Sequence, residues 1–237
     1  FPTTLDAQRQ GRVVSILDAG PTLEGLIITG GDATSVTLNC PTAGGVSDGC
    51  GGGVFVFGGS PLIVGNVISG NIGARSVGSH SASGGGLCLE SGNGSVISGN
   101  LIISNTASTG ARGMGGGIHL QLASSVLVTG NRLIGNSGTT HTSLPGWGGA
   151  IAADHGTATS AIVNNRIEGN RTNGNGTSYG AAIYTWYGSI RIADNDITGN
   201  VGPEVLFLGN YAGAHCEANR IIDNDTSVGI RLWNGYG

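Results

Sequence analysis

Glu90, His119 and Asp154 carry acid/base side chains on the same predicted face of three consecutive segments, GGGLCLE, GGGIHLQ and GGAIAAD. Glu90 and Asp154 take the last position of their segments, and His119 lies two positions before the end of its own. If these segments are stacked parallel strands, neighbouring side chains lie about 4.8 Å apart and the two carboxylates roughly 10 Å apart. That separation is near the range in which one carboxylic acid protonates a glycosidic oxygen while a second carboxylate activates water. The same residues also fit an outward strand face whose polar side chains are solvated, and we give that interpretation more weight.

Aromatic residues on the same predicted face provide a second candidate chemistry. Tyr184 and Trp186 lie in the next segment of the repeat, GAAIYTW, and Tyr187 follows it directly. Trp233 lies in the last apolar stretch of the chain. Exposed aromatic rings can stack on sugars, which would make these residues a glycan-binding surface. Packing beneath the neighbouring insertions is the competing interpretation, and we give it somewhat more weight.

An internal repeat defines the elements that must position these side chains. Six hexapeptides, NVISGN, NLIISN, NRLIGN, NRIEGN, NDITGN and NRIIDN, begin at Asn66, Asn100, Asn131, Asn165, Asn195 and Asn219. Units of 24 to 34 residues, each with three short strands, cannot bury an apolar face alone and must stack on their neighbours. The sequence therefore predicts an all-β fold, a right-handed parallel β-helix of about seven coils, forming a single domain over residues 1–237.

The asparagines are expected to form the corners of the coils. Asparagine tolerates the left-handed backbone region, and identical side-chain amides one strand spacing apart can hydrogen-bond along the stack. A second series lies five residues after the first, at Asn71, Asn105, Asn136, Asn170, Asn200 and Asn224. Two asparagine ladders are therefore predicted.

Alternation in the first strand of each coil predicts which side chains face the core. Leu87 and Leu89 are expected to point inward, and in the penultimate coil the same reading places Val205 and Phe207 inward and Leu206 and Leu208 outward. Variable insertions precede these strands. They cover residues 32–50, 72–83, 106–114, 137–147 and 171–179.

Both ends of the predicted stack lack an amphipathic capping helix. Residues 11–31 fit a degenerate coil, and the final segment GIRLWNG starts an eighth coil. Open strand edges can pair with another chain. We therefore expect self-association through the open helix ends, head to tail, which would propagate into filaments.

Composition excludes several kinds of partner. The chain has a formal net charge of -4 and no lysine, so a phosphate-neutralising surface for nucleic acid is not expected. Its apolar runs are far too short for membrane insertion, and residues 1–20 lack the pattern of a signal peptide. No residue spacing indicates a metal site or a cofactor.

Two of the four cysteines bracket a short Gly/Pro-rich stretch, CPTAGGVSDGC, in which a disulfide between Cys40 and Cys50 is geometrically easy. Such a bridge would indicate an oxidising, extracytoplasmic setting. Four reduced thiols in a cytosolic protein remain the alternative. The pairing of Cys88 and Cys216 is left open.

The alternation of GGGI or GGAI with IxGN or IxSN, as in NLIISNTASTGARGMGGGIHL, resembles the repeats of bacterial polymorphic outer-membrane proteins and related surface adhesins. The order of strands and corners is also similar to the wider pectate-lyase-like superfamily, which contains polysaccharide lyases, glycoside hydrolases and non-catalytic adhesins. The resemblance implies an extracellular or cell-surface protein, and in the enzymes it implies a substrate groove on the outer face of the first strand of each coil. This sequence departs from the lyases, since that face offers neither lysine nor an aspartate cluster.

These observations favour a non-catalytic β-helix with a structural or adhesive role. The alternative is a polysaccharide lyase or glycoside hydrolase that uses Glu90, His119 and Asp154. A third candidate is a glycan-binding module that binds without catalysis. It would use Tyr184, Trp186, Tyr187 and Trp233.

Overall fold

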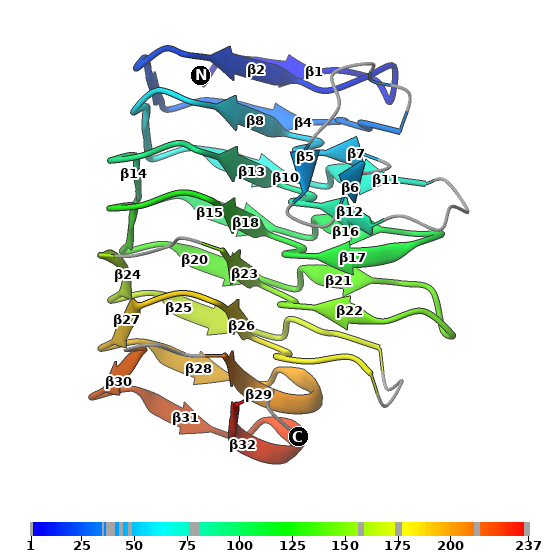
Figure 1. Ribbon diagram of the computed structural model, residues 1–237. Helices are drawn as coiled ribbons and strands as arrows, with labels where there is room; N and C mark the ends of the chain where they lie inside the picture. Colours follow the sequence, from blue (N-terminus) through cyan, green and yellow to red (C-terminus); the bar gives the residue numbers. More distant parts are fainter. Residues whose placement is uncertain are drawn as a thin grey trace.

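Short apolar strands that alternate with glycine and asparagine corners fold into stacked triangular coils (Figure 1). The computed structural model describes residues 2–34, 36, 41–42, 45–46, 49–75, 81–155, 159–173, 177–210 and 214–234. Three main sheets, which we number 1 to 3, contain eight, seven and eight strands, and every strand pair within them is parallel. The predicted right-handed parallel β-helix of about seven coils is confirmed.

Each face of the triangular coil is one of these sheets. Sheet 1 contains β2 (Val14–Leu17), β8 (Val54–Phe57), β13 (Leu87–Glu90), β18 (Ile118–Gln121), β23 (Ile151–Asp154), β26 (Ile183–Trp186), β29 (Val201–Gly209) and β32 (Asp225–Trp233). Sheet 2 contains β3 (Thr22–Glu24), β9 (Leu62–Val64), β14 (Val96–Ser98), β19 (Leu127–Thr129), β24 (Ser160–Val163), β27 (Ile190–Ala193) and β30 (His215–Glu217). Sheet 3 contains β1 (Thr4–Asp6), β4 (Ile27–Thr29), β10 (Val67–Ser69), β15 (Leu101–Ile103), β20 (Arg132–Ile134), β25 (Arg166–Glu168), β28 (Asp196–Thr198) and β31 (Arg220–Ile222).

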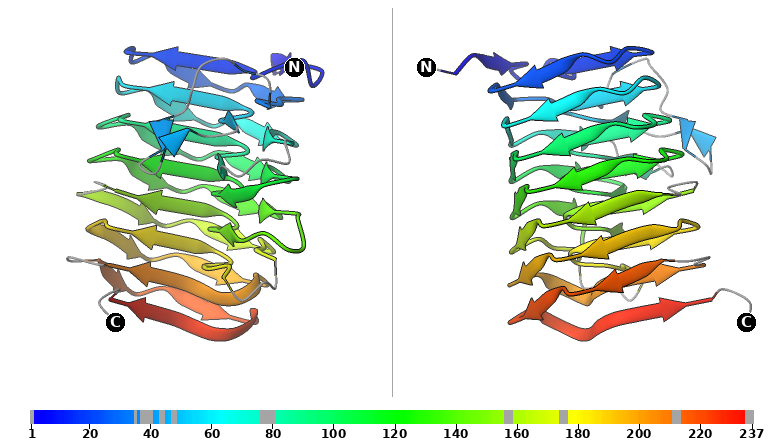
Figure 2. Two further views of the ribbon diagram at one scale, coloured as in Figure 1. Left: turned by 45° about the vertical axis from the view of Figure 1, so that its right-hand side comes forward. Right: turned by 90° about the vertical axis from the view of Figure 1, so that its left-hand side faces the viewer.

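The segments predicted as insertions form further stacked strands beside the coils. The outgoing arch strands are β11 (Ile72–Ala74), β16 (Thr106–Ser108) and β21 (Ser137–Thr139). The returning arch strands are β7 (Gly49–Cys50), β12 (Ser81–Ser83), β17 (Arg112–Met114) and β22 (Gly146–Trp147), and a two-stranded antiparallel pair joins β5 (Pro41–Thr42) to β6 (Gly45–Val46). Figure 2 shows the arches projecting from one side of the stack.

Small residues allow the arch strands to pack closely. A Cβ atom on Gly113 of β17 would collide with the carbonyl oxygen of Gly138 in β21, and a Cβ on Gly73 of β11 would meet the carbonyl oxygens of Ala107 and Ser83. Side chains larger than glycine would therefore separate the outgoing strands from the returning ones. The high glycine content serves this close approach as well as the turns.

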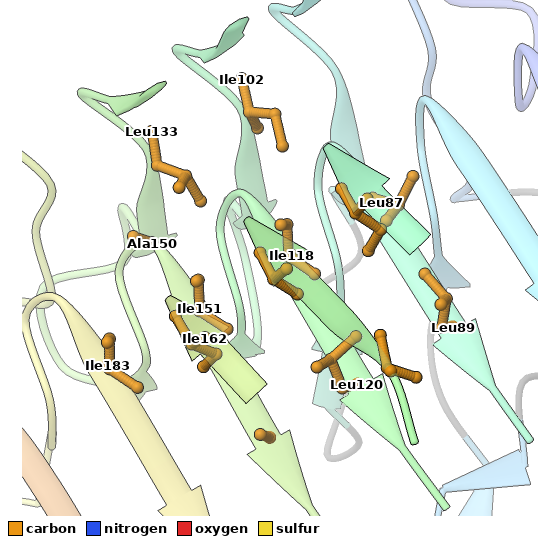
Figure 3. Packing of buried hydrophobic residues seen from close by; sticks show 14 of the residues in the cluster. Leu87, Leu89, Ile102, Ile118, Leu120, Leu133, Ala150, Ile151, Ile162 and Ile183 are labelled. Carbon is orange, nitrogen blue, oxygen red and sulfur yellow. The ribbon is translucent and has the colours of Figure 1, made fainter. Parts of the chain in front are cut away.

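The hydrophobic core fills the interior of the coils in aligned columns (Figure 3). Leu87 pairs with Ile118, and Leu89 with Leu120, and all four side chains are fully buried. One predicted register is wrong, because Ile183 aligns with Leu206 and Thr185 with Leu208. Leu206 and Leu208 therefore face the core.

Phe207 consequently points outward rather than into the core. The cause is that β29 runs straight through nine residues and enters through Pro203 and Glu204. The glycines that mark the start of the equivalent strands are missing there, so the alternation in this strand has no fixed starting point.

Both asparagine ladders are present, and their members are buried except for the last of each, Asn219 and Asn224, which are partly exposed. In the first ladder the Nδ2 group of Asn131 donates to Asn165 Oδ1 at 3.0 Å and to the carbonyl of Ile97 at 2.9 Å. Asn100 in turn donates its backbone N–H and its Nδ2 to Asn131 Oδ1, at 2.9 and 3.0 Å. Each amide in the middle of the ladder therefore joins three successive coils.

The prediction that the ladder asparagines themselves adopt the left-handed backbone conformation is wrong. The left-handed residue is the one before each ladder asparagine, as at Gly65, Gly99, Gly130 and Asn164, whose φ values are 62°, 63°, 64° and 56°. Glycine carries no Cβ penalty in that region. The ladder asparagines are therefore selected by their hydrogen bonds, whereas the residue before each of them makes the turn.

The last coil leaves core positions open to solvent. Ile230 and Leu232 align with the buried Leu206 and Leu208, yet they are 43% and 65% exposed. Self-association through the ends of the stack stays a prediction.

The ladder predicts unequal effects for two neighbouring substitutions. Asn165→Leu should destabilise the fold by about 3 kcal/mol or more, because it removes several hydrogen bonds and leaves buried partners unsatisfied. Asn164→Gly should be neutral or slightly stabilising, because Asn164 is exposed and has a φ of 56°. Urea denaturation midpoints measure both effects. Equal losses for the two variants would contradict this assignment of the corner.

Candidate functional site

The outer face of sheet 1 aligns the candidate residues in two columns. One column contains Phe55, Cys88, His119, Ala152, Tyr184, Phe207 and Arg231. The other contains Phe57, Glu90, Gln121, Asp154, Trp186, Gly209 and Trp233. Glu90 and Asp154 are therefore two rungs apart with Gln121 between them, as the repeat predicts.

His119 connects neighbouring polar side chains on this face. Its Nε2 lies 3.1 Å from Asp154 Oδ1, and its Nδ1 lies 3.8 Å from Cys88 Sγ. Because an ionised carboxylate only accepts hydrogen bonds, Nε2 carries the proton that faces Asp154, and Nδ1 is free to accept one from the thiol. His155 Nδ1 lies 3.4 Å from the other carboxylate oxygen of Asp154.

The surroundings drive the pKa values of the two carboxyl groups in opposite directions. Burial alone would raise the pKa of Asp154, but the charge and hydrogen bond of His119, together with His155, hold it below its ordinary value. Burial, and secondarily the charge of Asp154, raises the pKa of Glu90 to about 7. Burial also raises the pKa of the Cys88 thiol. Near neutral pH the site thus contains a readily protonated Glu90 and an ionised Asp154.

These groups are buried, so the expectation of a solvated polar face is wrong here. The His119 side chain has no exposed surface, the Asp154 side chain is 7% exposed, and Glu90 is 2% exposed. The Oε2 atom of Glu90 has no hydrogen-bond partner in the part of the chain that the structure describes. Such a group is costly when ionised, which agrees with its raised pKa.

Residues of the first coils and of the arches cover part of this outer face of sheet 1. Cys88 lies in a buried cluster with Phe55 and Cys50, and Cys50 ends the returning strand β7. The Arg12 guanidinium lies over the Phe55 ring, 4.3 Å from its centroid, and donates to the carbonyl of Cys50 at 2.7 Å. Burial lowers the pKa of Arg12 to about 10.

An aromatic cluster continues the same outer face toward the C-terminus. Its members are Trp147, Tyr179, Tyr184, Trp186, Tyr187 and Phe207. The rings of Tyr184 and Trp186 are stacked, with centroids 6.3 Å apart and planes 5° apart, and Phe207 stacks on both. Tyr187 is 53% exposed and Trp186 is partly exposed, whereas Tyr184 is buried.

The structure brings three of the four predicted aromatic residues together. Trp233 lies on the last coil, aligned with Gly209, and makes no ring contact with other described residues. Trp147 and Tyr179 were missed by the sequence reasoning, although a signal existed. Each immediately precedes a corner glycine of positive φ, the place that Met114 occupies one coil earlier.

The Cys40–Cys50 disulfide involves Cys40, which lies outside the described residues, so the pairing stays a prediction. Cys88 and Cys216 are free cysteines. The described ranges contain no group of three or more His, Cys, Asp or Glu residues that could hold a metal ion. They also contain no helix long and apolar enough to cross a membrane.

Comparison with known proteins agrees with this architecture. Residues 24–236 match the family model of the right-handed β-helix region. The chain therefore belongs to the right-handed β-helix family. No curated protein and no solved structure matches the chain.

The buried carboxyl group predicts a pH-dependent difference in stability. Because the pKa of Glu90 is raised from 4.5 to about 7, the folded state retains a proton that the unfolded state loses in that interval. The contribution of Glu90 to stability therefore falls as pH rises through this window. Glu90→Gln, which has no such proton to lose, should match the wild type near pH 4 and exceed it by about 1–3 kcal/mol near pH 8.

Urea denaturation at both pH values measures this difference. Glu168→Gln is the control, because this carboxylate pairs with Arg166 on the outer side of β25, and it should change stability by less than about 0.5 kcal/mol at either pH. If the stability of the wild type and of Glu90→Gln changed with pH in the same way, ionisation of Glu90 would not destabilise the folded chain. That result would contradict the prediction.

Proposed function

We propose that this chain is an adhesive, glycan-binding β-helix that acts in an extracellular or cell-surface setting. The single observation that carries the proposal is the aromatic cluster on the outer face of sheet 1, which leaves Tyr187 53% exposed and Trp186 partly exposed beside a layer of buried rings. Buried Tyr184 and Phe207 fix the orientation of Trp186. A rigid exposed ring loses little conformational entropy when it binds the apolar face of a sugar.

Polar groups at the edge of the cluster suit the hydroxyl groups of a sugar. The rings of His155 and Tyr187 have centroids 5.2 Å apart, and the His155 side chain is 35% exposed. Its contact with Asp154 raises the pKa of His155, and an imidazole ring carries an N–H donor whether it is neutral or charged. Asp154 contacts His155 at this edge, and its negative charge disfavours acidic sugars. We therefore expect a neutral glycan.

A second candidate function is glycoside hydrolysis, and the opposed pKa shifts of Glu90 and Asp154 favour it. A protonated Glu90 would act as general acid and an ionised Asp154 as general base. Two strand spacings separate them by roughly 10 Å, near the range of inverting enzymes. The burial of Glu90, His119 and Asp154 weighs against this function, because each catalytic group must reach the substrate.

Affinity measurements on a panel of soluble glycans test the proposal. Neutral polymers such as a β-glucan, a xylan and a mannan should be retained, and polygalacturonate should not. Trp186→Ala should weaken binding about tenfold, equivalent to about 1.4 kcal/mol. Trp233→Ala is the matched control, because this tryptophan is also exposed but lies outside the cluster, and it should leave binding unchanged.

Three outcomes separate the candidates. Retention without product, weakened only by Trp186→Ala, supports the binding function. Release of reducing ends that is abolished by Glu90→Gln and by Asp154→Asn supports the hydrolase. Absence of retention by every glycan, or equal weakening by Trp186→Ala and Trp233→Ala, contradicts a glycan site at the aromatic cluster.

A further inference from the structure

Gly209 is a buried glycine on the outer face of sheet 1, beside the partly exposed end of the aromatic cluster. It ends β29 and aligns with Trp186 of β26 on one side and with Trp233 of β32 on the other. The other residues of this outward column are all larger, and from β2 to β32 they are Leu17, Phe57, Glu90, Gln121, Asp154, Trp186 and Trp233. Glycine therefore occurs in this column only in the coil that directly follows Trp186.

The backbone at this position does not require glycine. Gly209 lies in a regular strand, and it is not among the described glycines with a left-handed φ, such as Gly148 and Gly180. A glycine in a strand loses more conformational entropy on folding than other residues do, and it has no side chain to pack. Close approach of another group is a common reason for such a glycine.

The indole of Trp186 occupies the space that a side chain at Gly209 would need. A Cβ atom on Gly209 would collide with Cε3 and Cζ3 of Trp186, and it would lie 2.6 Å from Cε1 of Phe207. Among the glycines that the structure describes, Gly209 is the one whose three nearest neighbours are all aromatic ring atoms. We call the space between Trp186, Phe207 and the backbone of Gly209 the indole seat.

The indole seat sets the orientation of the Trp186 ring. With the indole against the backbone of β29, its plane is 5° from that of Tyr184 and 19° from that of Phe207. Tyr184 and Phe207 are buried, whereas Trp186 is partly exposed. A methyl group added at Gly209 would therefore displace mainly the Trp186 ring, because that ring can move toward solvent and the buried rings cannot.

We propose that Gly209 is a positioning residue of the glycan-binding surface, because its lack of a side chain lets the Trp186 indole lie across two coils in one fixed orientation. The inference rests on the proposed function and extends it: the sugar face that stacks on Trp186 lies over β26 and β29. A ring that is already ordered loses little entropy when a ligand binds. The affinity for a neutral glycan then depends on a residue that contributes no side chain to the surface.

Binding of soluble β-glucan, xylan and mannan to Gly209→Ala tests this role. The substitution should weaken the binding of the polymers that the wild type retains by about fivefold, because it displaces the indole. Gly229→Ala is the matched control and should leave binding unchanged. Gly229 also lies in a strand of sheet 1 without a left-handed φ, and a Cβ atom there would meet nothing within 4 Å.

Fluorine NMR of protein labelled with a fluorinated tryptophan observes the ring itself, whether or not a glycan binds. The chain has three tryptophans, so Trp186→Phe assigns the Trp186 signal by its loss. Gly209→Ala should shift the Trp186 signal, and Gly229→Ala should not.

The same two substitutions in combination separate positioning from a merely structural effect. Trp186→Phe removes the indole atoms that a Cβ on Gly209 would meet, and it leaves Phe207 room to shift. In that background Gly209→Ala should change neither glycan binding nor the melting temperature. A glycine needed only for folding would instead lower the melting temperature equally in both backgrounds, which would overturn the proposal. If Gly209→Ala alone failed to fold, recovery of folding in the Trp186→Phe background would support it.

The outcomes distinguish this inference from the proposed function. Weaker glycan binding together with a shifted Trp186 signal in Gly209→Ala supports the positioning role. If the wild type binds a glycan and Gly209→Ala binds it equally well, or if the Trp186 signal does not shift, the positioning role is overturned and the proposed function stands. If the wild type binds none of the polymers, the proposed function is overturned, and the role of Gly209 in binding with it.

Discussion

The hydrogen bonds between successive coils are the interaction on which the rest of the molecule depends, and the buried asparagine amides make them specific. In the middle of each ladder one side chain accepts from the coil before it and donates to the coils on both sides, as Asn131 does between Asn100 and Asn165. A strand of three or four residues has too little area to fold alone. The ladder fixes the vertical register at both ends of each sheet 3 strand, so the apolar columns align and the outer face of sheet 1 acquires its order. Toward the N-terminus the ladders end where the backbone N–H groups of Leu26 and Gly31 donate to Asn66 and Asn71.

That register converts sequence spacing into the geometry of the sites. Residues at equivalent positions in consecutive coils become neighbours one rung apart, which places Cys88 beside His119 and Glu90 two rungs from Asp154. The arches then decide which part of the outer face is covered and which is open. Returning strands carry Met114 and Trp147 against the aromatic rings. In the described part of the next coil, isolated bridges replace the arch strands. The stack is thus a uniform scaffold, and its chemical variety comes from the outward columns and from the length of the arches.

Much of this architecture could be predicted from the sequence, because the asparagine hexapeptides and the glycines before Leu87 and Ile118 fix the phase of each coil. Prediction failed at Phe207, where Pro203 and Glu204 replace the usual glycines and the phase is lost. The arches could not be predicted, since strands such as Ser81–Ser83 and Ser137–Thr139 lack apolar alternation and are held by close packing against glycine. For the same reason the burial of His119 could not be predicted. A strand pattern shows which way a side chain points but not whether another segment covers it.

Hydrogen exchange of side-chain amides measures the ladder directly. The account predicts that the Nδ2 protons of Asn131 and Asn165, each bonded to the next coil in a buried ladder, exchange orders of magnitude more slowly than those of the exposed Asn93. Two-dimensional NMR after transfer to heavy water resolves these side-chain groups. Persistence of the ladder amides, together with the backbone amides of sheet 3, would support stacking through the ladder. Loss of the ladder amides as fast as those of Asn93, while the backbone amides of sheet 3 remain protected, would contradict it.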